Sequence, residues 1–114
     1  MTSLTPGDVV WVPFPHVEEN RIRPRPALVV ATGLGPDASL CWAMMITNAE
    51  RASWPGDLVI ADHAALRLPI PSKIRIEKIA TLDASRATLL GRLPDAEMAV
   101  VAERMARYTG GQVV

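Results

Sequence analysis

Three arginines near the N-terminus have a spacing that suits the binding of a phosphate. Arg21, Arg23 and Arg25 occur in the segment RIRPRPALVVA, which covers residues 21–31. Each interleaved proline fixes its own φ and pushes the preceding residue toward extended geometry. Arg23 and Arg25 both precede a proline, so their guanidinium groups lose little conformational freedom on binding an anion. The pattern predicts a phosphate site at the start of a strand; the alternative is that the arginines cap the strand in solvent.

A second group of candidate residues follows two other apolar runs. Thr47 ends the run LCWAMMIT and Asn48 follows it; the threonine hydroxyl could donate a hydrogen bond to a substrate oxygen or simply precede a turn at Asn48. In the segment KIRIE, alternation places Lys73, Arg75 and Glu77 on one face of a strand. A guanidinium and a carboxylate on one face could bind an anion and move a proton. The alternative is a solvated strand face with a weak ion pair.

His16 and Trp54 lie in loops where they could also contact a nucleic acid. His16 precedes the arginine–proline segment and could act as a general acid, and a surface histidine is the alternative. Trp54 is followed by Pro-Gly and could stack on an unpaired base or pack over the end of the sheet. Neither His16 nor His63 has a partner at metal-ligand spacing, so the sequence predicts no metal site.

Length and composition restrict the class of protein. A chain of 114 residues, 49% hydrophobic and 21% charged, fits one globular domain spanning residues 1–114. The single cysteine, Cys41, excludes an intrachain disulfide and a cysteine-rich zinc site. No apolar run approaches the ~20 residues of a membrane span and no signal peptide is apparent, so we expect a cytoplasmic protein with no membrane partner. Basic and acidic residues number 12 each, which argues against a general nucleic-acid coat but allows a local site.

The elements that must position these residues are short strands followed by one helix. Strands are predicted at residues 9–14, 26–32, 40–47, 57–61, 73–82 and 88–92. Lys78 breaks the alternation of the fifth strand, so we expect a bulge there. From Pro94 the apolar residues recur at spacings of three and four, until Gly110 and Gly111 end the pattern. This order predicts a mainly β protein, a small barrel with a C-terminal helix at residues 94–108.

The order and spacing of several short motifs resemble the MazF/PemK toxins of bacterial toxin–antitoxin systems. The motifs are GDVVWV, RPALVV, IT, PSKIR, IATLD and LGRL, which begin at residues 7, 25, 46, 71, 79 and 90. The resemblance implies an SH3-like barrel of the CcdB/MazF type that works as a homodimer. It also implies a metal-independent endoribonuclease with no cofactor, which cleaves single-stranded RNA, including mRNA, and is held silent by an acidic cognate antitoxin.

The resemblance also implies roles for particular residues. The arginine that opens a strand in the family corresponds to Arg25, and the threonine after the family's third strand corresponds to Thr47. Some members carry an Arg-x-Asp pair on the fifth strand. This chain has Arg75 and Glu77 at those positions, and the glutamate departs from the family pattern by one methylene.

Cleavage of RNA without a metal ion requires removal of the 2′-OH proton and stabilisation of charge on the phosphoryl oxygens. Glu77 is the expected base, and Arg25 and Arg75 are the expected donors to those oxygens. Thr47 is expected to hydrogen-bond the scissile phosphate, and the products would be a 2′,3′-cyclic phosphate and a 5′-OH. The general acid stays unassigned, because arginine, with a pKa above about 12, is a poor proton donor.

Further contacts to RNA are expected from Arg23, Lys73, Trp54 and His16. Glu18 and Glu19 place two carboxylates in the loop before the arginines, where they would oppose a phosphate backbone. Two alternative functions stay open: a CcdB-like toxin that contacts DNA gyrase without catalysis, and an inactive member kept as a regulator.

The predicted helix carries an apolar stripe that could bury in either of two ways. It could pack on the barrel of its own chain, or it could form part of a two-fold homodimer interface. In the dimer, we expect the two subunits to build a groove that binds an RNA strand or the acidic tail of an antitoxin. The stripe consists of Met98, Val101, Ala102 and Met105.

Overall fold

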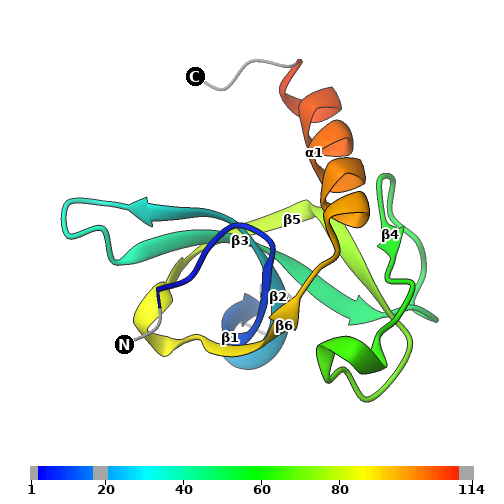
Figure 1. Ribbon diagram of the computed structural model, residues 1–114, viewed down its shortest axis with the longest axis horizontal. Coiled ribbons are helices and arrows are strands. Elements are labelled where there is room, and N and C mark those ends of the chain that lie inside the picture. The colour runs from blue at the N-terminus through cyan, green and yellow to red at the C-terminus, as the bar shows by residue number, and fades with distance from the viewer. Residues whose placement is uncertain (1–2, 17–20, 111–114) are drawn as a thin grey trace.

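Six strands form one antiparallel sheet that curls on itself, and a single helix follows at the C-terminal end (Figure 1). The computed structural model describes residues 3–16 and 21–110. The strand order in the sheet is β4-β5-β3-β2-β1-β6. The elements are β1 (Asp8–His16), β2 (Arg21–Leu34), β3 (Leu40–Asn48), β4 (Leu58–Val59), the 3₁₀ helix η2 (Ala64–Leu66), β5 (Ser72–Asp83), the 3₁₀ helix η3 (Ala84–Arg86), β6 (Thr88–Arg92) and α1 (Asp95–Thr109). This architecture confirms the predicted mainly β fold with a C-terminal helix.

Some of the predicted features lie outside the described residues. They include Glu18 and Glu19, and also the side chains of His16 and Arg21, whose backbones pair with each other at the end of the β1–β2 ladder.

β2 begins earlier than the sequence predicts, so the arginine–proline segment belongs to the strand itself. Pro24 pairs with Pro13 of β1, and Pro26 pairs with Trp11. The ladder between β2 and β3 starts only at Ala27. A proline, which lacks an N–H, is tolerated where a strand has a neighbour on one side alone. The segment therefore keeps its extended geometry as part of a ladder with β1.

The pairing between β3 and β5 shifts in the middle of the two strands. Ile46 pairs with Ile74, whereas Met44 pairs with Ile79. Residues 75–78 therefore lie opposite a single residue of β3, which confirms the bulge predicted in this strand. A bulge of this kind bends its strand and changes the direction of the side chains that follow.

The curled sheet is buried on both faces by two separate apolar clusters. Neighbouring residues of the central strands alternate between them, as expected for a strand that is covered on both sides. The first cluster lies under α1 and contains Val9, Leu28, Met44, Ile46, Ile60, Leu66, Leu68, Ile74, Ile76, Leu93 and Val101. The second lies on the other face and contains Val10, Val12, Phe14, Ala27, Val29, Cys41, Ala43, Met45 and Leu82.

α1 covers the first cluster. The helix begins and ends one residue later than the predicted range of 94–108. Gly110, at a φ of 66°, ends the helix in the left-handed conformation that glycine adopts without strain. Val101 is fully buried, while Met98 and Met105 are partly buried against the same cluster. The stripe thus packs on the barrel of its own chain, although Ala102 remains exposed. Within the described part of the chain, no helix is long and apolar enough to cross a membrane.

Candidate active site

Arg25 and Thr47 lie on neighbouring strands and approach each other through the register of the sheet. Ala27 of β2 pairs with Met45 of β3. Continuing this register by two residues brings Arg25 opposite Thr47. Side chains two residues apart on a strand share a face, so both residues lie on the side of the second apolar cluster.

The guanidinium of Arg25 is half-buried and partly unsatisfied. Its backbone pairs with Val12 of β1, which holds the side chain against the mouth of the curled sheet. Its Nε atom is buried and has no hydrogen-bond partner among the described residues. A buried donor without a partner costs roughly 1–3 kcal/mol, which an anionic ligand would relieve. Thr47, at 9% exposure, supplies a second donor next to this guanidinium.

Asn48, which follows Thr47, and Arg23, which lies near Arg25, have different surroundings. Asn48 forms a turn, because its Oδ1 accepts a hydrogen bond from the Glu50 backbone N–H at 2.9 Å. The alternative reading of Asn48 as a turn residue is therefore confirmed. Arg23 lies two residues before Arg25 on β2, and its side chain is exposed.

Lys73 and Arg75 do not lie on a solvated strand face, so the alternative interpretation of these two residues was wrong. Their side chains are only 2% and 8% exposed. The loop after β3 folds back over β5 and covers them. Lys73 Nζ donates to the carbonyl of Arg51, and Arg75 NH2 donates to the carbonyl of Ala52 at 2.7 Å. Both cations are therefore engaged by the loop.

Asp57 is the anion that balances this pair, and the sequence analysis did not identify it as a functional candidate. Its side chain is 6% exposed. Its Oδ2 lies 3.3 Å from Arg75 NH2 and 3.6 Å from Lys73 Nζ. The same oxygen accepts the backbone N–H of Trp54 at 3.0 Å. An aspartate that directly follows a Trp-Pro-Gly turn was the available signal, because such a carboxylate often bonds to the backbone of its own turn.

Trp54 stacks on the cation beneath it. The guanidinium carbon of Arg75 lies 4.3 Å from the centroid of the Trp54 ring. The indole nevertheless stays 37% exposed. One side of Trp54 therefore rests on a buried cation, in a cation–π contact, while the residue remains accessible from solvent.

α1 holds the end of the same loop. Arg104 NH1 donates to the carbonyls of Gly56 and Asp57, at 3.1 and 2.6 Å. The hydroxyl of Tyr108 donates to the carbonyl of Pro55 at 2.9 Å. The loop is thus fixed from β5 on one side and from the helix on the other.

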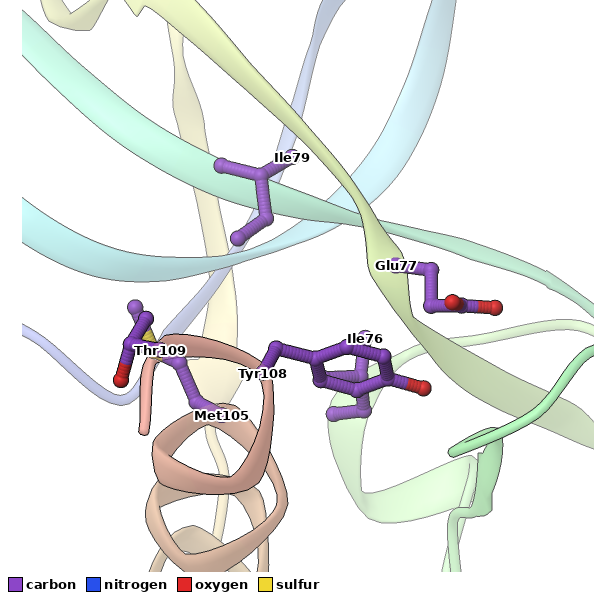
Figure 2. Close-up of a pocket in the computed structure, with 6 residues that line it drawn as sticks. All are labelled: Ile76, Glu77, Ile79, Met105, Tyr108 and Thr109. Atoms are coloured by element: carbon purple, nitrogen blue, oxygen red, sulfur yellow. The ribbon is translucent and has the colours of Figure 1, made fainter. Parts of the chain in front are cut away.

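Glu77 has different neighbours from Arg75 in the described structure, and its expected role as the base stays a prediction. The bulge in β5 turns Glu77 toward α1, where it lines a pocket of about 280 Å³ (Figure 2). Figure 2 shows its carboxylate and the Tyr108 hydroxyl on the same side of this pocket. Burial raises the pKa of Tyr108, and the neighbouring Glu77 carboxylate raises this pKa further. The other residues of the pocket are Ile76, Ile79, Met105 and Thr109.

The arrangement can bind an anion at one place and a flat ring beside it. Arg25 and Thr47 supply the hydrogen-bond donors. The loop that folds over β5 supplies the partly exposed side chain of Trp54. In residues 3–16 and 21–110, no three His, Cys, Asp or Glu side chains gather closely enough to hold a metal ion.

A curled antiparallel sheet with one C-terminal helix defines the class as an SH3-like barrel of the CcdB/MazF type. Residues 5–109 match the PemK-like, MazF-like toxins of type II toxin–antitoxin systems. The chain belongs to this family, which confirms the resemblance of its sequence motifs. A search of curated proteins gave no match.

Solved structures share the fold over nearly the whole chain. MazF from Deinococcus radiodurans is 25% identical, with a TM-score of 0.67, over 91% of this chain and 94% of that chain. A MazE–MazF complex from the same organism is 23% identical, with a TM-score of 0.68, over 96% of this chain and 99% of that chain. An endoribonuclease in complex with its cognate antitoxin, from a mycobacterial species, is 16% identical, with a TM-score of 0.69, over 97% of this chain and 100% of that chain.

Proposed function

We propose that this toxin is an endoribonuclease that cuts single-stranded RNA, including mRNA, without a metal ion. The observation that carries the proposal is the half-buried guanidinium of Arg25, whose Nε lacks a hydrogen-bond partner within the described residues, on the strand position that the register sets opposite Thr47. This pair of donors fits a phosphate. A mycobacterial protein of the same fold is described as an endoribonuclease, which supports the same conclusion.

In the proposed reaction, the 2′-oxygen of one nucleotide attacks its own 3′-phosphate. The bond from phosphorus to the 5′-oxygen of the next nucleotide breaks, and the products are a 2′,3′-cyclic phosphate and a 5′-OH. Arg25 stabilises the charge that develops on the phosphoryl oxygens, because its donors are in place before the reaction begins. Thr47 donates a hydrogen bond to the same phosphate and fixes its orientation.

Glu77 stays the candidate base for the 2′-OH proton, Arg75 stays a candidate donor to the phosphoryl oxygens, and the general acid is unassigned. Glu77 lines the pocket beside Tyr108 of α1. Arg75 and Lys73 are buried under the loop and already hold its carbonyls. Lys73 and Arg75 therefore also hold the loop in place.

The reaction is tested with purified protein and a mixed single-stranded RNA in the presence of EDTA. We expect cleavage to continue at an undiminished rate, since the donors named above need no metal. End-group analysis should find 5′-OH and 2′,3′-cyclic phosphate termini. Intact RNA, or activity that disappears on chelation, would contradict the proposal; intact RNA would instead favour the non-catalytic, CcdB-like alternative.

We further propose that the toxin is a two-fold homodimer and that it binds a cognate acidic antitoxin. Complexes of structurally similar toxins with their antitoxins support the second part. Support for the dimer comes from exposed apolar side chains near the end of α1: Ile79 is 43% exposed and Tyr108 is 50% exposed. A two-fold dimer is the commonest closed assembly that would cover such a surface.

Light scattering tests the assembly. We expect the mass of a dimer at micromolar concentration, and a monomer mass would exclude it. A competition assay tests the partner: an antitoxin that occupies the groove should displace RNA, because its carboxylates take the place of phosphates. Simultaneous binding of RNA and antitoxin would show that the two do not share a groove.

A further inference from the structure

The loop of residues 51–57 is held by four side-chain donors, two of which, Lys73 and Arg75, are buried. Side chains from β5 and α1 donate hydrogen bonds to backbone carbonyls along its length. Loops that carry function are commonly positioned by a rigid scaffold in this way. The donors are Lys73, Arg75, Arg104 and Tyr108.

Asp57 is at the centre of this arrangement, but its carboxylate is not placed for the strongest ion pair. Oδ1 of Asp57 and Nε of Arg75 are both buried, and neither has a hydrogen-bond partner among the described residues. A two-pronged pair of arginine and carboxylate would satisfy both atoms. The carboxylate instead directs Oδ2 to the backbone N–H of Trp54 as well as to Arg75. Buried atoms left without a partner cost stability, so this geometry favours one position of Trp54 at the expense of a better ion pair.

The loop lies beside the phosphate site. Lys73, which holds the loop, pairs directly with Thr47 of β3, and residues that pair in this way have side chains on the same face. Thr47 is opposite Arg25 of β2 in the extended register. Adjacent strands are about 4.8 Å apart, so Lys73 and Arg25 are separated by roughly 10 Å across the sheet. Neighbouring nucleotides of one RNA strand can span such a distance.

We propose that Asp57 is a positioning residue that fixes Trp54 as a stacking surface for a nucleobase next to the scissile phosphate. The inference rests on the proposed ribonuclease function and deepens it. Asp57 acts through two contacts: it bonds the Trp54 backbone, and it holds the guanidinium of Arg75 under the indole. A ring that is already in place loses little entropy when a base stacks on it. Because every base has a π face, Trp54 provides affinity for the strand and tolerates different sequences.

Steady-state cleavage of an oligonucleotide that the wild type cuts tests the stacking. Loss of the ring in Trp54→Leu should raise KM by roughly 5- to 150-fold, because stacking on an aromatic side chain is worth about 1–3 kcal/mol per base. kcat should stay nearly constant, and Trp54→Phe should remain close to the wild type. Trp42 is the matched control, since it is 38% exposed on β3 compared with 37% for Trp54. We expect Trp42→Leu to leave KM unchanged.

The positioning role of Asp57 is tested by coupling its variants to Trp54. Asp57→Asn should raise KM in the same direction as Trp54→Leu. The double variant should be no worse than Trp54→Leu alone, because Asp57 acts through Trp54. Asp57→Glu keeps the charge but displaces the carboxylate, so it should also raise KM. This variant replaces Asp57→Asn in the test if Asp57→Asn fails to fold. Additive effects in the double variant, or a wild-type KM in Asp57→Glu, would overturn the positioning role.

A fluorescence titration separates this inference from the proposed function. In a protein with Trp11→Phe and Trp42→Phe, Trp54 is the remaining tryptophan of the chain. Single-stranded RNA should quench its emission, and Asp57→Asn should weaken the quenching. A wild type that cuts no RNA would refute the ribonuclease, and the titration would then decide the stacking alone. Quenching supports the stacking role, whereas unchanged emission, or a wild-type KM in Trp54→Leu, overturns it.

Discussion

An RNA with a single 2′-deoxynucleotide at the cleavage site should resist cutting entirely. In the proposed reaction the 2′-oxygen is the nucleophile, so its removal leaves no group to attack the phosphorus. The donors of Arg25 and Thr47 bind the phosphate and do not contact the 2′ position in this scheme. The modified strand should therefore still bind. The measurement is gel-based cleavage of the matched pair of oligonucleotides, together with inhibition of cleavage of the natural strand by the modified one.

The position of the modification provides the control. The same 2′-deoxy substitution placed several nucleotides away should leave the cleavage rate close to that of the natural strand. Cleavage at the deoxy site would mean that water or a side chain attacks the phosphorus, and the proposed mechanism would be wrong. Resistance without competitive inhibition would mean that the 2′-OH is needed for binding. Single-turnover kinetics would then be needed to test the 2′-oxygen as the nucleophile.

Replacement of Arg25 by alanine should lower the cleavage rate by roughly 10²-fold or more. Removal of one preorganised donor to a developing oxyanion typically costs about this much. The stability of the variant should not fall, because the buried Nε of Arg25 has no hydrogen-bond partner in the described structure. The variant even removes an unsatisfied donor, whose burial costs about 1–3 kcal/mol. Single-turnover cleavage and thermal unfolding measure the two effects separately.

Two further variants sharpen this test. Arg25→Lys should recover little activity, because an ammonium group lacks the planar fork that contacts two phosphate oxygens at once. Arg107→Ala is the matched control: this arginine is exposed on α1 and forms an ion pair with Glu103 four residues earlier, an interaction of small energetic value. Equal rates for Arg25→Ala and the wild type would exclude Arg25 from the reaction. A large fall in the melting temperature would indicate a structural role instead.

Local patterns in the sequence were sufficient for the elements of the fold. The alternation of apolar residues, the turn residues between the runs and the change of period at Pro94 predicted the strands and α1 with small errors at their ends. Such signals depend on neighbours a few residues apart, and backbone geometry turns them directly into secondary structure. The main error was the start of β2, since two prolines concealed a strand that pairs on one side only.

The sequence by itself predicted Arg25 and Thr47 as phosphate contacts, and the register of the sheet then brought Arg25 opposite Thr47. Only the tertiary structure decided the positions of the second set of residues. Alternation predicted one shared face for Lys73, Arg75 and Glu77, but alternation carries no information about a loop that returns over the strand. That loop buries the two cations, and the bulge turns Glu77 toward α1. Asp57 acquires its importance for the same reason: its partners Lys73 and Arg75 are distant in sequence, and only the folded loop brings their charges together.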